Sequence, residues 1–119
     1  MDLDAAIIAH TRWKDKIKES IYTGTKLDAV LLAKDDQCDL GKWLQAAPAA
    51  ERSLPEFETV KVKHTHFHKV ASETALQAGR LPREEAVKLL VGATKYGLAS
   101  AGCVSAIVAL RNALQKQPR

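Results

Sequence analysis

Apolar side chains recur along the first twenty residues at the period of one helical face. One ladder, with steps of three, four and seven residues, consists of Leu3, Ile7, His10, Ile17 and Ile21. Charged side chains occupy the other faces, and this alternation is typical of an amphipathic helix. The pattern predicts a helix over residues 3 to 22 that ends at Thr23 and Gly24.

The next two stretches predict shorter elements. Residues 26 to 38 mix apolar and polar positions and predict a loop with a short helical piece. Residues 39 to 47, with the sequence DLGKWLQAA, predict a brief helix that stops before Pro48. The reason for this stop is that the residue preceding a proline is biased away from helical geometry.

A long amphipathic stretch predicts a third helix from near Ser53 to about Ala78. Glu56 stands three residues after Ser53, which is the spacing of a capping box, and Pro55 suits a first helical turn. The apolar stripe of this helix consists of Phe57, Val60, His64, Phe67, His68, Ala71 and Ala75.

The last apolar stretch predicts a fourth helix from Pro82 to about Gln115. Glycines lower helix propensity, so three of them at five-residue intervals indicate close approach of a neighbouring helix or a break. They are Gly92, Gly97 and Gly102. Short connections between helical segments predict an all-α, four-helix-bundle-like domain, with a short extra helix carrying the Cys-x-Leu-Gly-Lys-Trp-Leu motif.

Composition agrees with this fold and narrows the classes of function. A chain of 119 residues fits one domain spanning residues 1–119, and alanine and leucine, which favour helices, outnumber the 5% of aromatic residues. No basic segment precedes the short apolar start, and no run of ~18 consecutive apolar residues occurs, so we expect a cytoplasmic protein that does not bind membranes. The net charge of +4 comes from interspersed charges, which indicates a solvated surface rather than a nucleic-acid interface.

Three of the four histidines lie in one HTHFH segment of the predicted third helix. His64 and His68 are four residues apart, so they project from one helical face, whereas His66 points to roughly the opposite side. Both His64 and His68 lie on the apolar stripe, where unpaired imidazoles are costly to bury. The pair therefore predicts a metal site, the alternative being a coincidence on a polar face.

His10 and Cys38 are the other candidate ligands. His10 lies on the inward ladder of the first helix, where a lone histidine is either a hydrogen-bonded core residue or a ligand. Cys38 precedes a helix whose dipole favours a thiolate, whereas Cys103, in an apolar stretch, fits a small buried residue better. Three imidazoles and one thiolate suit zinc and close its tetrahedral shell. Trp13 and Trp43 are expected to pack over such a site.

No constellation of catalytic residues accompanies these ligands. The chain has no HExxH motif, no GxSxG motif and no glycine-rich phosphate loop. A shell of four protein ligands also leaves no resting position for a reactive water. We therefore expect a protein that is not an enzyme and has no catalytic residues.

The order of these residues resembles the chemoreceptor zinc-binding domain family of bacteria. The match runs from His10 through CDLGKWL at residues 38–44 to HxxFH at residues 64–68 and covers nearly the whole chain. The resemblance implies a bundle that holds one zinc through His10, Cys38, His64 and His68. It implies no ligand role for His66.

The family also implies a role in signalling. Its members occur at an end of soluble chemoreceptors or beside diguanylate cyclases, are implicated in sensing zinc or hypochlorous acid, and commonly form homodimers. The resemblance thus implies a sensory or regulatory module that acts as a homodimer, or with a chemotaxis or cyclic-di-GMP signalling protein in trans. Because this chain contains neither a signalling coiled coil nor a cyclase domain, we expect a stand-alone member or a fragment.

Two other interpretations stay open. One is a structural zinc in an adaptor domain without any sensing. The other is a hemerythrin-like di-iron bundle, which also carries histidines on helices but needs bridging carboxylates and additional histidines.

Overall fold

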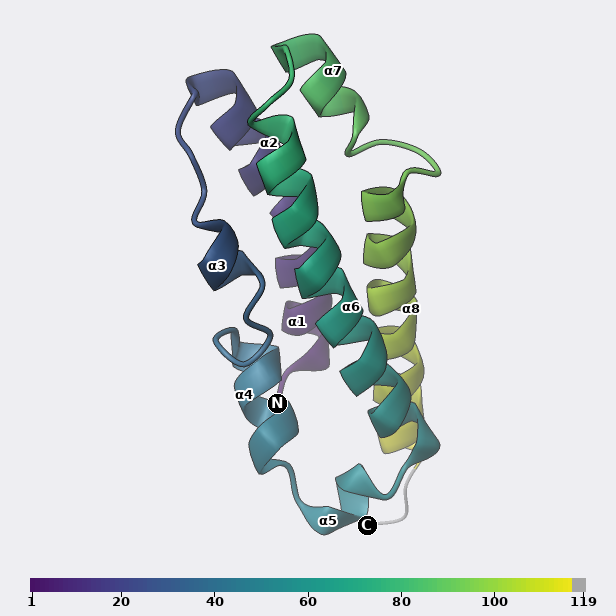
Figure 1. Ribbon diagram of the computed structural model, residues 1–119. Coiled ribbons are helices and arrows are strands. Elements are labelled where there is room, and N and C mark those ends of the chain that lie inside the picture. The colour runs from purple at the N-terminus through teal and green to yellow at the C-terminus, as the bar shows by residue number, and fades with distance from the viewer. Residues whose placement is uncertain (117–119) are drawn as a thin grey trace.

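Three helical rods, flanked by short helices, form the fold of the computed structural model, which describes residues 1–116 (Figure 1). The rods are α1 (Leu3–Thr11) continued by α2 (Trp13–Thr23), α6 (Pro55–Ala78), and α8 (Lys95–Gln115). The short helices are α3 (Ala29–Leu32), α4 (Asp39–Ala46), α5 (Ala49–Arg52) and α7 (Arg83–Lys88). These elements confirm the predicted all-α, bundle-like fold.

The first predicted helix is divided at Arg12. The carboxylate of Asp2 accepts a hydrogen bond from the amide of Ala5 and caps α1. Arg12 keeps helical dihedral angles, and its amide donates to the carbonyl of Ile8. The interruption is therefore slight, and α2 continues the direction of α1 (Figure 1).

The start of α6 differs from the predicted capping box. Leu54 is the N-cap residue and makes no side-chain capping bond. Residues 49–52 form α5, which the sequence did not predict, and the hydroxyl of Ser53 donates to the carbonyl of Ala50 at the end of that helix. Ser53 therefore closes α5 instead of opening α6. The predicted end at Ala78 is confirmed.

The predicted fourth helix is broken, so one continuous helix from Pro82 to Gln115 is wrong. Gly92 has φ +68°, which ends helical geometry between α7 and α8. The hydroxyl of Thr94 then caps α8 by accepting from the amide of Gly97 at 3.1 Å. A Cβ at Gly97 would lie 2.1 Å from the carbonyl oxygen of Gly92, so this reversal also requires a glycine there.

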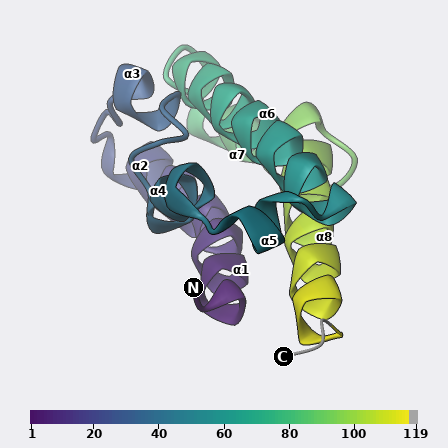
Figure 2. The same ribbon diagram turned by 90° about the horizontal axis from the view of Figure 1, so that it is seen from below.

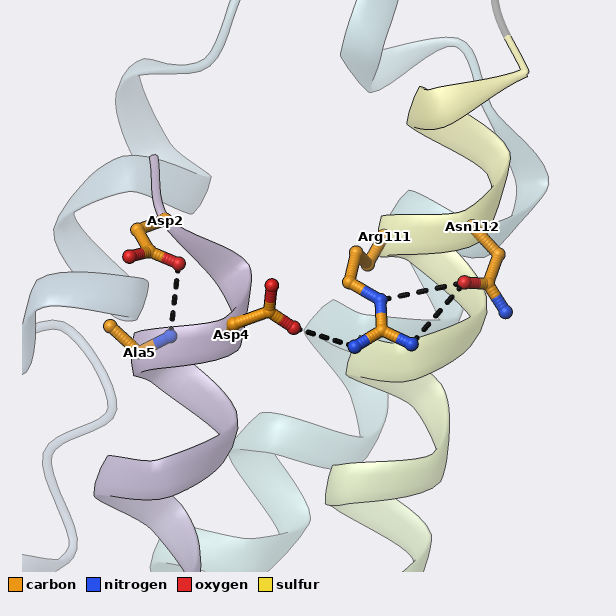
Figure 3. A network of polar contacts seen from close by, with 5 residues as sticks. All are labelled: Asp2, Asp4, Ala5, Arg111 and Asn112. Carbon is orange, nitrogen blue, oxygen red and sulfur yellow. Dashed lines mark hydrogen bonds and ion pairs between the residues drawn. The ribbon is translucent and has the colours of Figure 1, made fainter.

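The main core lies where α6 and α8 pack on each other and on α1. Viewed from below, α4 lies on the α1 side of the bundle, away from α8 (Figure 2). The largest fully buried side chains include Ile17, Phe57, Phe67, Tyr96, Ile107 and Leu110. At the rim, Arg111 on α8 pairs with Asp4 on α1 at 2.5 Å, and this contact ties the first turn of α1 to the far end of α8 (Figure 3).

Among the described helices, α8 alone is long and apolar enough to meet the length and composition of a membrane span. Its buried residues pack into the core, and they make up 28% of its most apolar stretch of 18 residues. A core helix of a bundle passes the same test.

Candidate metal centre

Four side chains from three parts of the chain meet in one cluster. His10 comes from α1, Cys38 immediately precedes α4, and His64 and His68 come from α6. Their candidate ligand atoms all lie within 4.8 Å of one another. The structure thus brings together every residue that the sequence proposed as a ligand.

Three distances within this cluster are close to those between ligands of a single ion. The Nε2 atoms of His64 and His68 are 3.0 Å apart, and the Sγ of Cys38 lies 3.2 Å and 3.7 Å from them. Ordinary zinc–ligand bond lengths imply edges of about 3.3 to 3.6 Å in a tetrahedron of nitrogen and sulfur donors. His66 is exposed on another face of α6, as its spacing predicts.

Backbone carbonyls orient two of the three imidazoles. The Nδ1 of His10 donates to the carbonyl of Ala6 at 2.7 Å, and that of His68 donates to the carbonyl of Leu32 at 3.0 Å. A carbonyl can only accept, so in both rings Nε2 carries the lone pair that a metal needs. The Nε2 of His10 is buried and has no hydrogen-bond partner within residues 1–116. A bond to a metal ion satisfies this atom.

Cys38 is positioned by the first turn of α4. Its sulfur caps the helix by accepting from the amide of Gly41 at 3.3 Å. A Cβ at Gly41 would lie only 1.7 Å from the carbonyl oxygen of Asp35, so the preceding turn packs directly on this glycine. The amides and dipole of a helix N-terminus favour a thiolate over a neutral thiol.

Burial keeps the imidazoles in the form that binds metal. Burial lowers the pKa of His10 and His68, and burial together with the neighbouring His68 and His10 lowers that of His64 to about 3. Burial raises the pKa of the Cys38 thiol, although the Gly41 amide opposes this change. Metal binding therefore finds neutral histidines and displaces the proton of one thiol.

A contact outside the cluster fastens the Cys38 segment to α6. The hydroxyl of Thr65 donates to the carboxylate of Asp35 at 2.5 Å, and the Asp35 carbonyl lies 3.8 Å from the Cys38 sulfur. A small cavity of about 140 Å³ adjoins this contact and reaches His64. This role of Asp35 is not visible in the sequence, because a carboxylate in a polar turn looks the same whether it faces solvent or a neighbouring helix.

Aromatic side chains cover part of the cluster. Phe67 is fully buried against His10, with ring centroids 5.6 Å apart, and Trp13 lies edge-on to His68 at 6.3 Å. The expectation that both tryptophans cover the site holds only for Trp13, because Trp43 packs on Phe57 instead. Cys103 is fully buried in the core, as predicted.

The donor set fits zinc. Three neutral imidazoles and one thiolate form a borderline-soft group of four, and tetrahedral zinc sites are closed by such groups. The cluster includes no carboxylate, whereas a di-iron centre of the hemerythrin kind needs bridging carboxylates.

Comparison with known proteins agrees with this geometry. A family model described as a chemoreceptor zinc-binding domain matches residues 10–75, a range that contains His10, Cys38, His64 and His68. Searches of curated proteins and of solved structures found no match. The matched range is more than half of the 119-residue chain, and this zinc-binding chain therefore belongs to the chemoreceptor zinc-binding domain family.

Proposed function

We propose that this zinc-binding chain is a sensory or regulatory module in which Cys38 responds to oxidants. The observation that carries the proposal is an asymmetry among the four ligands. His10, His64 and His68 are 1 to 3% exposed on α1 and α6, whereas Cys38 is only half-buried at the start of α4. Cys38 is thus the one ligand that combines sulfur redox chemistry with access from solvent.

The reaction with hypochlorous acid is a two-electron oxidation of sulfur. Zinc, when bound, keeps Cys38 as a thiolate at neutral pH. The sulfur of Cys38 gains a bond to the hydroxyl oxygen and loses two electrons, while the oxygen–chlorine bond breaks and chlorine leaves as chloride. The product is a neutral sulfenic acid, so the balanced change is thiolate plus hypochlorous acid to sulfenic acid plus chloride.

Loss of the thiolate would release the segment that carries it. Residues 33–38 connect two short helices, and besides the Cys38 sulfur itself their side-chain link to α6 is the exposed Asp35–Thr65 hydrogen bond. A ligand that no longer binds the ion leaves this segment held by few contacts. A local change of order of this kind is the signal that a partner reads.

We propose that the protein is cytoplasmic. We also propose that it is not an enzyme, since four protein ligands leave no open position on the ion. Its output goes through a homodimer, or through a chemotaxis or cyclic-di-GMP signalling protein in trans. Membership of the chemoreceptor zinc-binding domain family supports this setting.

Elemental analysis of the purified protein tests the proposal directly. Wild type and Cys103→Ala should each bind one zinc and release it after about one equivalent of hypochlorous acid. Cys38→Ala should bind zinc much more weakly. Retention of zinc by oxidised wild type overturns the sensing role, and full zinc affinity in Cys38→Ala removes Cys38 from the site.

The alternative is a structural zinc in an adaptor domain. The buried histidines and their backbone hydrogen bonds favour it, since such rigidity suits a permanent site. A zinc affinity far tighter than free cytosolic zinc, together with no release on oxidation, is the result that selects this alternative.

A further inference from the structure

A second, larger cavity lies at the end of the bundle where α2 and α6 finish. Its volume is about 520 Å³, within the size range of sites for small organic ligands. The walls come from the end of α2, the linker before α3, the end of α6 and the connection to α7, which lie near one another at the top of Figure 1. None of the four zinc ligands lines it.

The lining has two chemical parts. One part is apolar, with Ile21, Leu27, Leu76 and Leu81, and Leu76 is 53% exposed. The other part is cationic and consists of Lys26, Arg80 and Arg83. No aspartate or glutamate lines the cavity. An apolar wall next to uncompensated positive charge fits a molecule that is apolar at one end and anionic at the other.

One of the three cations is already held in place. The guanidinium of Arg83 donates to the carbonyl of Tyr22 at 3.1 Å and lies 5.4 Å from the centre of the Tyr22 ring. Cations near a helix C-terminus commonly bind its open carbonyls, and this explains Arg83. It does not explain Lys26 or Arg80, whose side chains form no hydrogen bond or ion pair within residues 1–116.

We propose that this cavity binds a small amphiphilic organic anion. Its carboxylate, sulfonate or phosphate group lies against Lys26 and Arg80, and its alkyl or aromatic body lies against Ile21, Leu27 and Leu76. The anionic group supplies the missing countercharge, and the apolar body covers leucine surface that the fold leaves in water.

The cavity is connected to the metal centre through α3, so a bound ligand can affect the groups that orient a zinc ligand. Leu27 leads directly into α3, whose Ala29 carbonyl accepts from the hydroxyl of Ser72 at 2.7 Å. The last residue of α3, Leu32, accepts the hydrogen bond that orients His68. A role of the bound anion as a second signal to the metal centre rests on the proposed sensing function, whereas binding of the anion to the cavity does not.

Fluorescence titration of the zinc-loaded full chain tests the binding. The probe is 8-anilinonaphthalene-1-sulfonate, and N-phenyl-1-naphthylamine supplies the same aromatic body without the sulfonate. We expect one sulfonate probe per chain, bound at least about tenfold more tightly than the neutral dye. Binding of the two dyes with equal affinity overturns the proposal, as does displacement of the probe by inorganic phosphate at similar concentration.

Matched variants locate the site. Arg80→Gln and Lys26→Gln should each weaken binding of the sulfonate by about tenfold. Lys88→Gln and Lys42→Gln remove the same charge from exposed positions outside the cavity and should leave it unchanged. Equal weakening in all four variants shows non-specific charge attraction and overturns the site. Zinc content and the helical circular dichroism of each variant verify that the fold is intact, and zinc release by oxidant is scored separately.

Discussion

The two sides of the metal centre are built by different means. On the histidine side, three imidazoles project from α1 and α6 into the core, and the carbonyls of Ala6 and Leu32 fix two of the rings. On the cysteine side, Cys38 lies in a stretch of short helices and turns and is only half-buried.

The histidine side is therefore preorganised for the metal, whereas the cysteine side is the one that can change its order. Helices in a packed core hold the histidines whether or not a metal is bound, so they contribute affinity at little ordering cost. Local contacts hold the cysteine side, and the metal supplies much of its order. Changes on the histidine side should therefore cause the larger losses of zinc affinity, and changes on the cysteine side should cause smaller losses of affinity or faster release of zinc.

Removal of a central histidine should have the largest effect. His64 lies closer to Cys38 than His68 does and is also 3.0 Å from His68, so His64→Ala removes a ligand that contacts two of the others. We expect zinc affinity to fall by more than about 100-fold, because loss of an outer-sphere partner alone costs 10- to 100-fold. Competition with a chelator of known affinity measures this change.

His66→Ala is the matched control, because it removes an exposed imidazole from the same helix. It should bind zinc like wild type. If His64→Ala retains wild-type affinity, the histidine side does not dominate binding and the contrast between the two sides fails.

A methyl group at Gly41 tests the tight packing of the cysteine side. The added Cβ would lie 1.7 Å from the Asp35 carbonyl oxygen, so Gly41→Ala must displace the turn that precedes Cys38. We expect zinc affinity to fall by about 10- to 100-fold, as for disruption of supporting groups in metal sites. Isothermal titration with zinc measures the loss.

Gly102→Ala is the control for that substitution. Its Cβ would meet nothing nearer than the Cδ of Lys63 at 3.9 Å, so zinc binding should be unchanged. Replacing a glycine inside a helix should also raise the free energy of unfolding by up to about 1 kcal/mol. Unchanged zinc affinity in Gly41→Ala would show that the cysteine side tolerates displacement.

Acid should weaken the metal-free fold through the histidine side. An imidazole titrates near 6.5 in the unfolded chain, whereas burial and the neighbouring histidines lower the pKa of His64 to about 3 in the folded chain. The unfolded state therefore binds more protons below pH 6.5, and stability falls as the pH falls. For His64 alone the loss between pH 7 and pH 5 is about 2 kcal/mol, and burial of His10 and His68 acts in the same direction.

Urea unfolding of the metal-free protein at several pH values measures this loss. His66→Ala should show the same dependence on pH, because it leaves the buried imidazoles in place. A stability that stays constant from pH 7 to pH 5 contradicts the buried, neutral state of the histidines.

Sequence periodicity predicted the histidine side well, because the orientation of each histidine depends on the periodicity of a single helix. A spacing of four residues places His64 and His68 on one face of α6, and the ladder of the first helix turns His10 inward. The addition of Cys38 depended on motif order and family resemblance, since its contact with His64 spans 26 residues that include a loop and two short helices.

Two backbone hydrogen bonds and one helix break could not be predicted from the pattern of side chains. The carbonyls of Ala6 and Leu32 orient two ligands, but a backbone carbonyl is present in every residue. The glycines of the last apolar stretch predicted either a break in the helix or close approach of a neighbouring helix. The sequence did not decide between the two, because residues 89–91 remain apolar through the interruption. The positive φ of Gly92 decided between them.

The smallest effect concerns the contact between Asp35 and Thr65, which tests what holds the cysteine side. Asp35→Asn keeps the shape of the side chain and an oxygen that can accept from the Thr65 hydroxyl, but it removes the negative charge that strengthens this hydrogen bond. Thr65→Val removes the donor and should speed zinc release by about three- to tenfold, as measured by transfer to a chromogenic chelator. Asp35→Asn should act in the same direction by a smaller factor. Asp36→Asn is the control, since that carboxylate is exposed and accepts from its neighbour Gln37. Equal release rates in Asp35→Asn and Asp36→Asn would mean that the metal alone holds the cysteine side, so that oxidation of one sulfur frees the whole segment.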